Sequence, residues 1–312
     1  MSFDSIETVL VILVLLSVGF FMSWKGWLLK EHRPLLSKLI INIAVPAVTI
    51  KNFFDSFSKE IIFSSGKLFL MPLLVMIICF LIGILLSKIL KIDKSRKGSF
   101  ISMCTVSNTI FIGLPVCIGL FGEKSIPYAI FYYTVNTIVF WSLCAPKIKV
   151  DVEDNANSIM ESIKKILTPP LVTVLICIVL LLLDFRPPSI IIDTVKYLGN
   201  MSTPLSLIFI GGIIYEMGFN TIKVELSIII IMLMRFVIAP LITFFACKLV
   251  GLDELPTQVF TIQAAMPVMT QTVVVAETYN ADSQYVTKAA SLTTIASLIF
   301  IPIYMLLMPY LW

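Results

Sequence analysis

Two polar interruptions inside otherwise apolar stretches are the parts of this chain with residue types suited to chemistry. The first is Met103-Cys-Thr-Val-Ser-Asn-Thr-Ile-Phe-Ile-Gly-Leu-Pro115, and the second is Gln263-Ala-Ala-Met-Pro-Val-Met-Thr-Gln271. Both combine amides, hydroxyls and helix-breaking residues. A proline removes one backbone donor and frees a carbonyl, and in lipid such groups are costly unless protein or water satisfies them. We therefore expect both segments to face a cavity.

The chemistry that these segments predict is the binding of an anion. Helix N-termini within an interrupted span carry partial positive charge, and amide and hydroxyl side chains can donate directed hydrogen bonds to a carboxylate. The alternative is a polar patch that only holds helices together. The candidate substrate-binding residues are Asn42, Ser107, Asn108, Pro115, Pro267, Thr270 and Gln271.

Two basic residues are candidates for a supporting charge. Arg235 has nine uncharged residues before it and twelve after it, and an arginine buried in a membrane is usually functional or paired. Lys67 is nearer a span end, from which a lysine can reach the interface. Either residue could attract an anion or hold a contact between helices, and the sequence leaves both open. No Asp or Glu lies at a clear midplane position, which weighs against a proton relay or an acidic sodium site.

Other functional classes lack the residues that they need. His32 is the single histidine, so a metal site or an intramembrane enzyme would have neither a ligand set nor a base. The six cysteines lie in apolar stretches without a C-x-x-C pair and are predicted to be small packing residues. The lysines occupy short loops and form no single patch. We therefore predict no enzymatic activity, no metal, no cofactor and no nucleic-acid partner.

The two interruptions must be positioned by membrane helices. Mean hydropathy is +1.00 and 13% of residues are charged, against about 25% in soluble domains. Runs without charges predict an all-α integral membrane protein with ten transmembrane helices, each of about 20 residues. Their predicted ranges are 6–23, 36–54, 67–87, 98–121, 125–145, 164–183, 190–215, 225–247, 256–278 and 284–310.

The distribution of Lys and Arg sets the predicted orientation. With the N-terminus outside, the inner loops hold 15 basic residues and the outer side holds 7, which follows the positive-inside rule. Asp4 and Glu7 precede the first apolar run, so we predict a retained span rather than a signal peptide. The predicted location is the lipid bilayer of the plasma (inner) membrane, with both termini outside.

Three patterns recur in the same order in the two halves of the chain. The matched residues are Asn42 and Pro46 with Asn200 and Pro204, Lys67 and Pro72 with Arg235 and Pro240, and Tyr128, Thr137 and Ile138 with Tyr285, Thr294 and Ile295, at offsets of 158, 168 and 157. Five spans is an odd number, so the second half would enter the membrane from the opposite side. We predict a 5+5 inverted repeat with halves 1–145 and 164–312 and a cytoplasmic linker 146–163. Such repeats suit alternating access.

The two interruptions resemble spans four and nine of the auxin efflux carrier family. The resemblance rests on Ser107-Asn-Thr-Ile-Phe-Ile-Gly-Leu-Pro115 with Leu120-Phe-Gly122, and on Ala264-Ala-Met-Pro267 with Val275-Ala-Glu-Thr-Tyr-Asn280. It implies crossing broken helices in spans four and nine, a scaffold of spans one, two, six and seven, and a transport domain of spans three to five and eight to ten. It also implies a homodimer. Plant members carry a proline where this chain has Ser107, so the first break is expected to be softer or to rely on Gly113 and Pro115.

The resemblance also implies a function. It is that of a secondary transporter of small organic anions, such as malate- or malonate-like carboxylates or auxin-like acids, which works by elevator-type alternating access. The short connection between the halves resembles the bacterial type. Two alternatives stay open: a sodium-coupled organic anion symporter resembling the bile acid carriers, and a non-transporting membrane sensor.

Overall fold

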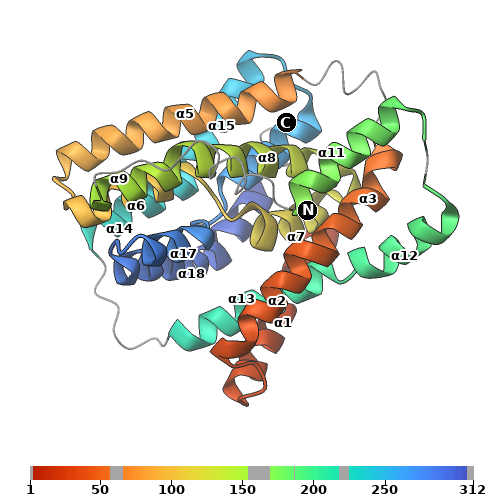
Figure 1. Ribbon diagram of the computed structural model, residues 1–312, viewed down its shortest axis with the longest axis horizontal. Helices are drawn as coiled ribbons and strands as arrows, with labels where there is room; N and C mark the ends of the chain where they lie inside the picture. The colour runs from red at the N-terminus through yellow and green to blue at the C-terminus, as the bar shows by residue number, and fades with distance from the viewer. Residues whose placement is uncertain (1–2, 57–65, 154–168, 186, 218–224, 308–312) are drawn as a thin grey trace. The chain divides into compact units, whose positions relative to one another are not determined.

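The computed structural model describes residues 3–56, 66–153, 169–185, 187–217 and 225–307 (Figure 1). In these ranges all regular structure is helical, and the one pairing of extended segments is an antiparallel bridge between Ser107 and Val268. The second part of the predicted linker, the start of predicted span six and the end of span ten lie outside the described residues. The all-helical prediction agrees with the structure in these ranges.

Six helical stretches of the described chain are long and apolar enough to cross a membrane. They correspond to predicted spans two, three, five, seven, eight and ten, and they cover Lys30–Lys51, Gly66–Ile89, Glu123–Lys149, Ser189–Glu216, Leu226–Leu249 and Ser283–Tyr304. Helices of this length and hydropathy match the thickness of a bilayer. The chain is therefore a multi-pass membrane protein, whereas the count of ten spans and the inverted repeat stay predictions.

The other four predicted spans are not among these six. Helix α1 (Phe3–Trp24) has 22 residues, with an apolar stretch at Val14–Trp24, and α11 (Pro169–Leu182) begins where the described residues resume. Predicted span four is divided into α6 (Lys94–Thr105) and the pair η3 (Thr109–Gly113) and α7 (Leu114–Phe121). Predicted span nine is divided into α16 (Glu254–Ala264) and α17 (Gln271–Thr278). Both divisions fall on the polar segments that the sequence singled out.

Four prolines each lie two residues beyond a π-helical turn, and the helix continues through every one of them. The turns and the helices that follow are η2 (Ile40–Ala44) with α3 (Val45–Ser56), η3 with α7, η5 (Phe140–Cys144) with α9 (Ala145–Glu153), and η6 (Met234–Ile238) with α15 (Ala239–Leu249). A proline ring clashes with the carbonyl four residues earlier, and the wider π turn takes up that clash. Gly113 and Pro115 thus lie within continuous helix, so the expectation that the first break relies on them is wrong.

The chain divides into two compact units. Unit 1 comprises Met1–Gly66, Ile110–Phe131 and Leu167–Gly218, and unit 2 comprises Lys67–Thr109, Tyr132–Ile166 and Phe219–Trp312. Helix α8 (Ile126–Val139) contributes residues to both. Predicted spans one, two, six and seven fall in unit 1, and predicted spans three, eight, nine and ten fall in unit 2.

Unit 1 depends on the close approach of helix backbones. A Cβ added at Gly211 of α13 (Ser202–Met217) would lie 2.0 Å from the carbonyl oxygen of Leu16 in α1, and one added at Gly19 would lie 2.1 Å from that of Ile208. Small residues allow such contact between membrane helices. Helix α3 packs on α11 and α12 (Ser189–Gly199), and Lys51 of α3 pairs with Glu123 of η4 (Glu123–Ser125) at 2.6 Å. This unit also contains η1 (Lys30–His32), α2 (Arg33–Leu39), η2, α7 and parts of η3 and α8.

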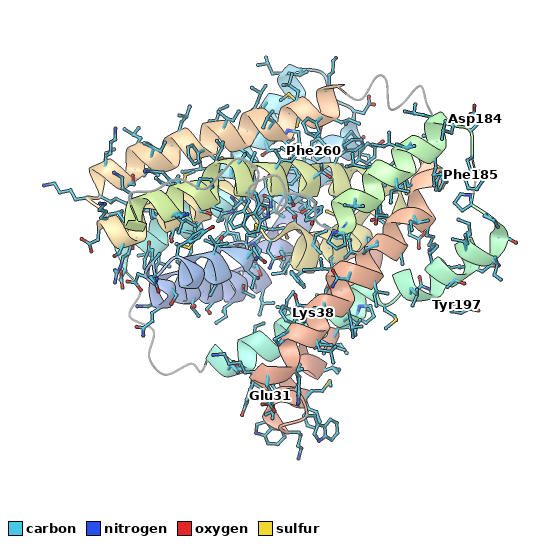
Figure 2. The ribbon with its side chains drawn as sticks, in the orientation of Figure 1. Glu31, Lys38, Asp184, Phe185, Tyr197 and Phe260 are labelled. Carbon is cyan, nitrogen blue, oxygen red and sulfur yellow. The ribbon has the colours of Figure 1, made fainter. Side chains whose placement is uncertain are left out.

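Unit 2 has a continuous apolar core with an apolar exterior. Its core is formed by α5 (Gly66–Ile89), α6, α14 (Leu226–Leu233) and α18 (Ser283–Leu307), with Phe100 and Ile231 fully buried. Phe260 of α16 is equally buried, in contrast to Tyr197 of unit 1, which is 79% exposed (Figure 2). One face of α5 exposes Leu70, Leu74, Leu81 and Leu85. An exposed apolar stripe of this length suits contact with lipid.

The glycine contact in unit 1 gives a direct test of the packing. Gly211→Ala should destabilise the protein by about 1–3 kcal/mol, because the new methyl group forces two backbones apart. The measurement is the melting temperature of the purified protein in detergent. Gly66→Ala is the matched control, since an added Cβ there meets nothing within 4 Å. Equal melting temperatures for the two variants would contradict the close contact of α1 and α13.

Candidate functional site

The two helix interruptions lie side by side in unit 2. Ser107, between α6 and η3, pairs in antiparallel fashion with Val268, between α16 and α17. The backbone N–H of Asn108 donates to the carbonyl of Pro267 at 2.8 Å. Backbone groups that a continuous helix would pair internally are thus paired between the two interruptions, which is how a non-helical segment can persist at membrane depth.

The first interruption needs no proline because side chains take over the helical hydrogen bonds. Asn136 of α8 accepts from the N–H of Ser107 and donates to its carbonyl, both at 3.1 Å. The hydroxyl of Ser107 donates to the carbonyl of Gln263 at 2.8 Å. Ser107, Asn136 and Gln263 are all fully buried. A buried amide that satisfies both polar groups of one residue fixes that residue in extended conformation.

The second interruption has a matching partner. The N–H of Val268 donates to the hydroxyl of Thr293 in α18 at 3.2 Å, while that hydroxyl donates to the carbonyl of Ala289 at 2.9 Å. Thr293 follows Asn136 by 157 residues, the same offset that relates Thr137 to Thr294 in the sequence. The two bridged residues are therefore held by side chains 157 residues apart, which is one of the offsets of the predicted repeat.

Arg235 fixes the ends of both interrupted helices. Its side chain is fully buried, and its guanidinium donates to the carbonyl of Cys104 at 3.3 Å, to that of Met266 at 3.2 Å, and to that of Ala264. Cys104 lies in the last turn of α6, and Ala264 ends α16. The last carbonyls of a helix have no partner within it. These contacts agree with the role in holding helices together, which is one of the two roles that the sequence left open for Arg235.

Asn108 and Thr270 form the polar face of the site. The side-chain amide of Asn108 donates to the hydroxyl of Thr270 at 3.0 Å. This bond uses the hydroxyl as an acceptor, so its hydrogen points elsewhere and can be donated to an acceptor. Thr270 directly precedes α17, which begins at Gln271, and both residues are partly buried. The arrangement offers a polarised hydroxyl next to a helix N-terminus, and both favour a negatively charged group.

The predicted site residues fall into three groups. Ser107, Asn108, Pro267 and Thr270 are brought together at the paired interruptions, and Gln271 adjoins them in the chain. Asn42, in η2, is exposed and belongs to unit 1, as does Pro115, which is buried in the first turn of α7. Lys67 is exposed and its ammonium lies 3.4 Å from the carbonyl of Val250, which agrees with a lysine at a span end.

Asn136 and Thr293 are the residues that the sequence did not single out. The signal that could have found them is their position: each directly precedes one of the matched pairs Thr137-Ile138 and Thr294-Ile295. When a pattern recurs in the apolar helices of both halves, a polar residue next to it in both copies is a candidate for a shared structural role. The side-chain amide of Gln263 is also buried, and within the described residues neither of its polar atoms has a partner.

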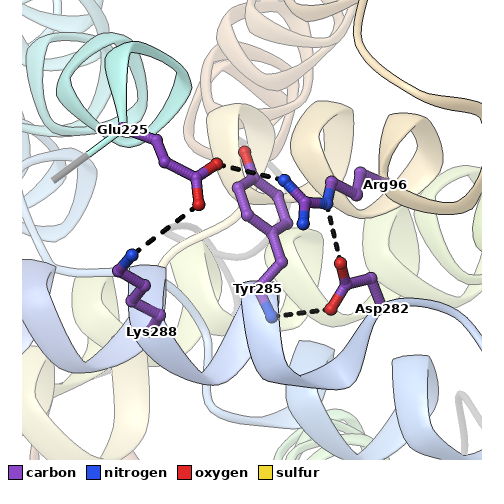
Figure 3. A network of polar contacts seen from close by, with 5 residues as sticks. All are labelled: Arg96, Glu225, Asp282, Tyr285 and Lys288. Carbon is purple, nitrogen blue, oxygen red and sulfur yellow. Dashed lines mark hydrogen bonds and ion pairs between the residues drawn. The ribbon is translucent and has the colours of Figure 1, made fainter. Parts of the chain in front are cut away.

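A network of ion pairs fixes the other end of α6 (Figure 3). Arg96 contacts Asp282 at 2.7 Å and Glu225 at 3.1 Å, and its guanidinium lies over the ring of Tyr285 at 4.9 Å. Lys288 adds a contact to Glu225 at 3.6 Å. These side chains join α6 to the start of α14 and to α18. Both ends of α6 are therefore tied to elements of the second half of the chain.

The hydrogen bonds of Asn136 can be tested by comparison with its neighbour. Asn136→Ala leaves the buried N–H and carbonyl of Ser107 without their partner, which costs about 1–3 kcal/mol for each group. We expect a clear fall in the melting temperature in detergent. Thr137→Val is the matched control, because the buried hydroxyl of Thr137 has no partner within the described chain. A Thr137→Val variant as unstable as Asn136→Ala would refute the assigned role.

The Arg96 network predicts how stability depends on pH. Burial alone would raise the pKa of Asp282, but the N–H of Tyr285 and the guanidinium of Arg96 outweigh it and lower that pKa from 3.8. A carboxylate with a lowered pKa stabilises the folded state above its unfolded-state pKa, and the effect disappears as the pH falls through the folded-state pKa. The stability difference between wild type and Asp282→Asn should therefore be constant near neutral pH, shrink as the pH falls below 3.8 and vanish below the lowered pKa of the folded protein.

The measurement is the melting temperature of both proteins from neutral pH down to about pH 3. Asp93→Asn is the control for the loss of one charge, because Asp93 is exposed and forms no ion pair within the described residues. A difference between wild type and Asp282→Asn that does not shrink below pH 3.8 would rule out the ionised pair as its source.

One family model and two relatives connect this chain to membrane transporters. The family model described as membrane transport protein matches residues 4–305. An uncharacterized transporter of Methanocaldococcus jannaschii is 27% identical over 309 residues, which cover 96% of this chain and 97% of the relative. An uncharacterized transporter of Methanothermobacter thermautotrophicus is 26% identical over 308 residues, with 96% and 97% covered. The resemblance noted from the sequence is thereby confirmed: the chain belongs to the membrane transport protein family, which is that of the auxin efflux carriers.

Proposed function

We propose that this transporter is a secondary carrier of small organic anions and binds the carboxylate of its substrate at the paired interruptions. The observation that carries the proposal is the hydrogen bond from Asn108 to Thr270 beside the N-terminus of α17. A carboxylate there would accept from the Thr270 hydroxyl and would lie at the positive end of α17, and hydrogen bonds to a charged group are the stronger kind. The N–H groups of Thr272 and Val273 already donate to the carbonyls of Met269 and Thr270.

The proposed mechanism is alternating access of the elevator type, with predicted spans three to five and eight to ten as the moving part and predicted spans one, two, six and seven as the scaffold. The two units follow this division except at Ile110–Phe131, which belongs to unit 1. The way the spans divide between the two units supports this assignment. Predicted spans one, two, six and seven belong to unit 1, and the bridged residues Ser107 and Val268 belong to unit 2. The assignment is also supported by the matched offset of Asn136 and Thr293, because two equivalent halves can exchange two equivalent conformations. A homodimer, and both termini outside, stay predictions from the sequence.

The test is uptake by proteoliposomes that contain the purified protein. Labelled malate, malonate and indole acetate form the first panel, chosen to cover dicarboxylates and an aromatic acid. We expect uptake of at least one carboxylate above that of protein-free liposomes. Folded protein that transports no member of a broad carboxylate panel would overturn the proposed function.

Variants of Asn108 and Thr270 test whether these two residues bind the substrate. Asn108→Ala and Thr270→Val each remove a hydrogen bond that supports a charged ligand, worth about 1.5–3 kcal/mol, so affinity should fall about tenfold to a hundredfold. The measurement is the substrate concentration for half-maximal uptake. Thr272→Val is the matched control, because the hydroxyl of Thr272 is buried without a partner within the described chain. Equal affinities for Thr270→Val and Thr272→Val would remove Thr270 from the binding site.

A further inference from the structure

Arg235 holds an unusual set of partners for a buried charge. Its three acceptors are all backbone carbonyls, those of Cys104, Ala264 and Met266. Within the described residues no carboxylate forms an ion pair with it, and its side chain is fully buried. A buried charge without compensation is strongly unfavourable. In the part of the chain that the structure describes, the compensating charge comes from the peptide groups.

The two helix ends supply a charge of the required size. The C-terminal end of an α-helix carries about half of one negative elementary charge. The guanidinium contacts the last turn of α6 and the end of α16, so two such ends together amount to about one negative charge. One guanidinium balances them. The planar fork of an arginine can address carbonyls in several directions at once, which a lysine cannot.

Carbonyl oxygens at the ends of interrupted helices are also the groups that hold coupling sodium ions in membrane carriers. Such an oxygen cage is neutralised either by a bound ion or by a fixed side-chain cation. Here the fixed cation is present, and it comes from the π turn η6 (Met234–Ile238), which precedes Pro240. Lys67, which the predicted repeat pairs with Arg235, is exposed, and its ammonium donates to the carbonyl of Val250 instead. A single guanidinium thus serves both interrupted helices.

We propose that Arg235 is a resident cation that takes the place of a bound alkali ion at the paired helix ends, so that anion binding and transport need neither Na⁺ nor K⁺. The part of this proposal that concerns transport rests on the proposed function as an anion carrier. The structural part, a fixed cation in place of a bound one, concerns the folded protein alone and is tested without substrate.

The first experiment measures the melting temperature of purified, substrate-free protein in NaCl, KCl and choline chloride at equal ionic strength. The wild type should melt at the same temperature in all three salts. Arg235→Ala should be destabilised in choline and recover by a few degrees in NaCl, KCl or guanidinium chloride at low concentration, since a ligand that binds only the folded state stabilises it. Tetramethylammonium, which has no N–H donor, should not restore it.

Arg235→Met is the matched control, because it fills much of the arginine's volume without charge and leaves little room for an added cation. It should be destabilised and should not respond to guanidinium. Stabilisation of the wild type by Na⁺ or K⁺ over choline would overturn the proposal. A folded Arg235→Ala protein that is equally stable with and without each cation would overturn it as well.

If Arg235→Ala does not fold, Arg235→Lys and the wild type decide the question. The lysine keeps the charge with poorer geometry, so it should melt at a lower temperature than wild type and be equally indifferent to the salt. A response of this variant to Na⁺ or K⁺ would contradict a fixed cation. The second experiment measures carboxylate uptake by wild-type proteoliposomes in sodium and in choline buffers, and equal rates are expected. Absence of all uptake with salt-independent melting would sink the proposed carrier function and leave the resident cation standing.

Discussion

Unpaired backbone groups at an interrupted membrane helix are the constraint on which unit 2 depends. Each interruption exposes N–H and carbonyl groups that lipid cannot satisfy. The structure meets this demand with a bridge between Ser107 and Val268, a bond from Asn108 to Pro267, and side chains from helices that flank the break. Each interruption therefore supplies hydrogen-bond partners that the other one needs. Neither α6 nor α16 could end where it does if its counterpart ran on as a regular helix.

A proline alone does not break a helix in this structure, and the first interruption forms without one. Pro46, Pro115, Pro146 and Pro240 are each absorbed by a π turn, and the chain remains helical on both sides. At Ser107 the helix stops with no proline at hand, because Asn136 and Gln263 offer its backbone and hydroxyl better partners than the next helical turn would. A break needs alternative partners for the freed groups. Where only the steric clash of a proline is present, one wider turn is enough to relieve it.

The sequence was informative where a polar or charged side chain lies within a long apolar run. Amides and hydroxyls within apolar runs located both interruptions, and a lone arginine between long uncharged stretches indicated that Arg235 is buried. The partners of Arg235 could not be predicted, because they are backbone carbonyls, which every sequence has. Asn136 and Thr293 escaped notice for a related reason: one polar residue in a membrane helix is common, and only its distance to a particular N–H in the fold gives it a role.

The fixed charge of Arg235 also bears on which ligands the site can prefer. An interrupted helix presents a negative C-terminal end and a positive N-terminal end close together, and their fields oppose each other at the break. Arg235 neutralises the C-terminal ends of α6 and α16, whereas the N-terminus of α17 keeps its positive potential. The remaining field next to Asn108 and Thr270 is therefore positive. This asymmetry supports the proposed preference for an anion and requires no basic side chain in contact with the ligand.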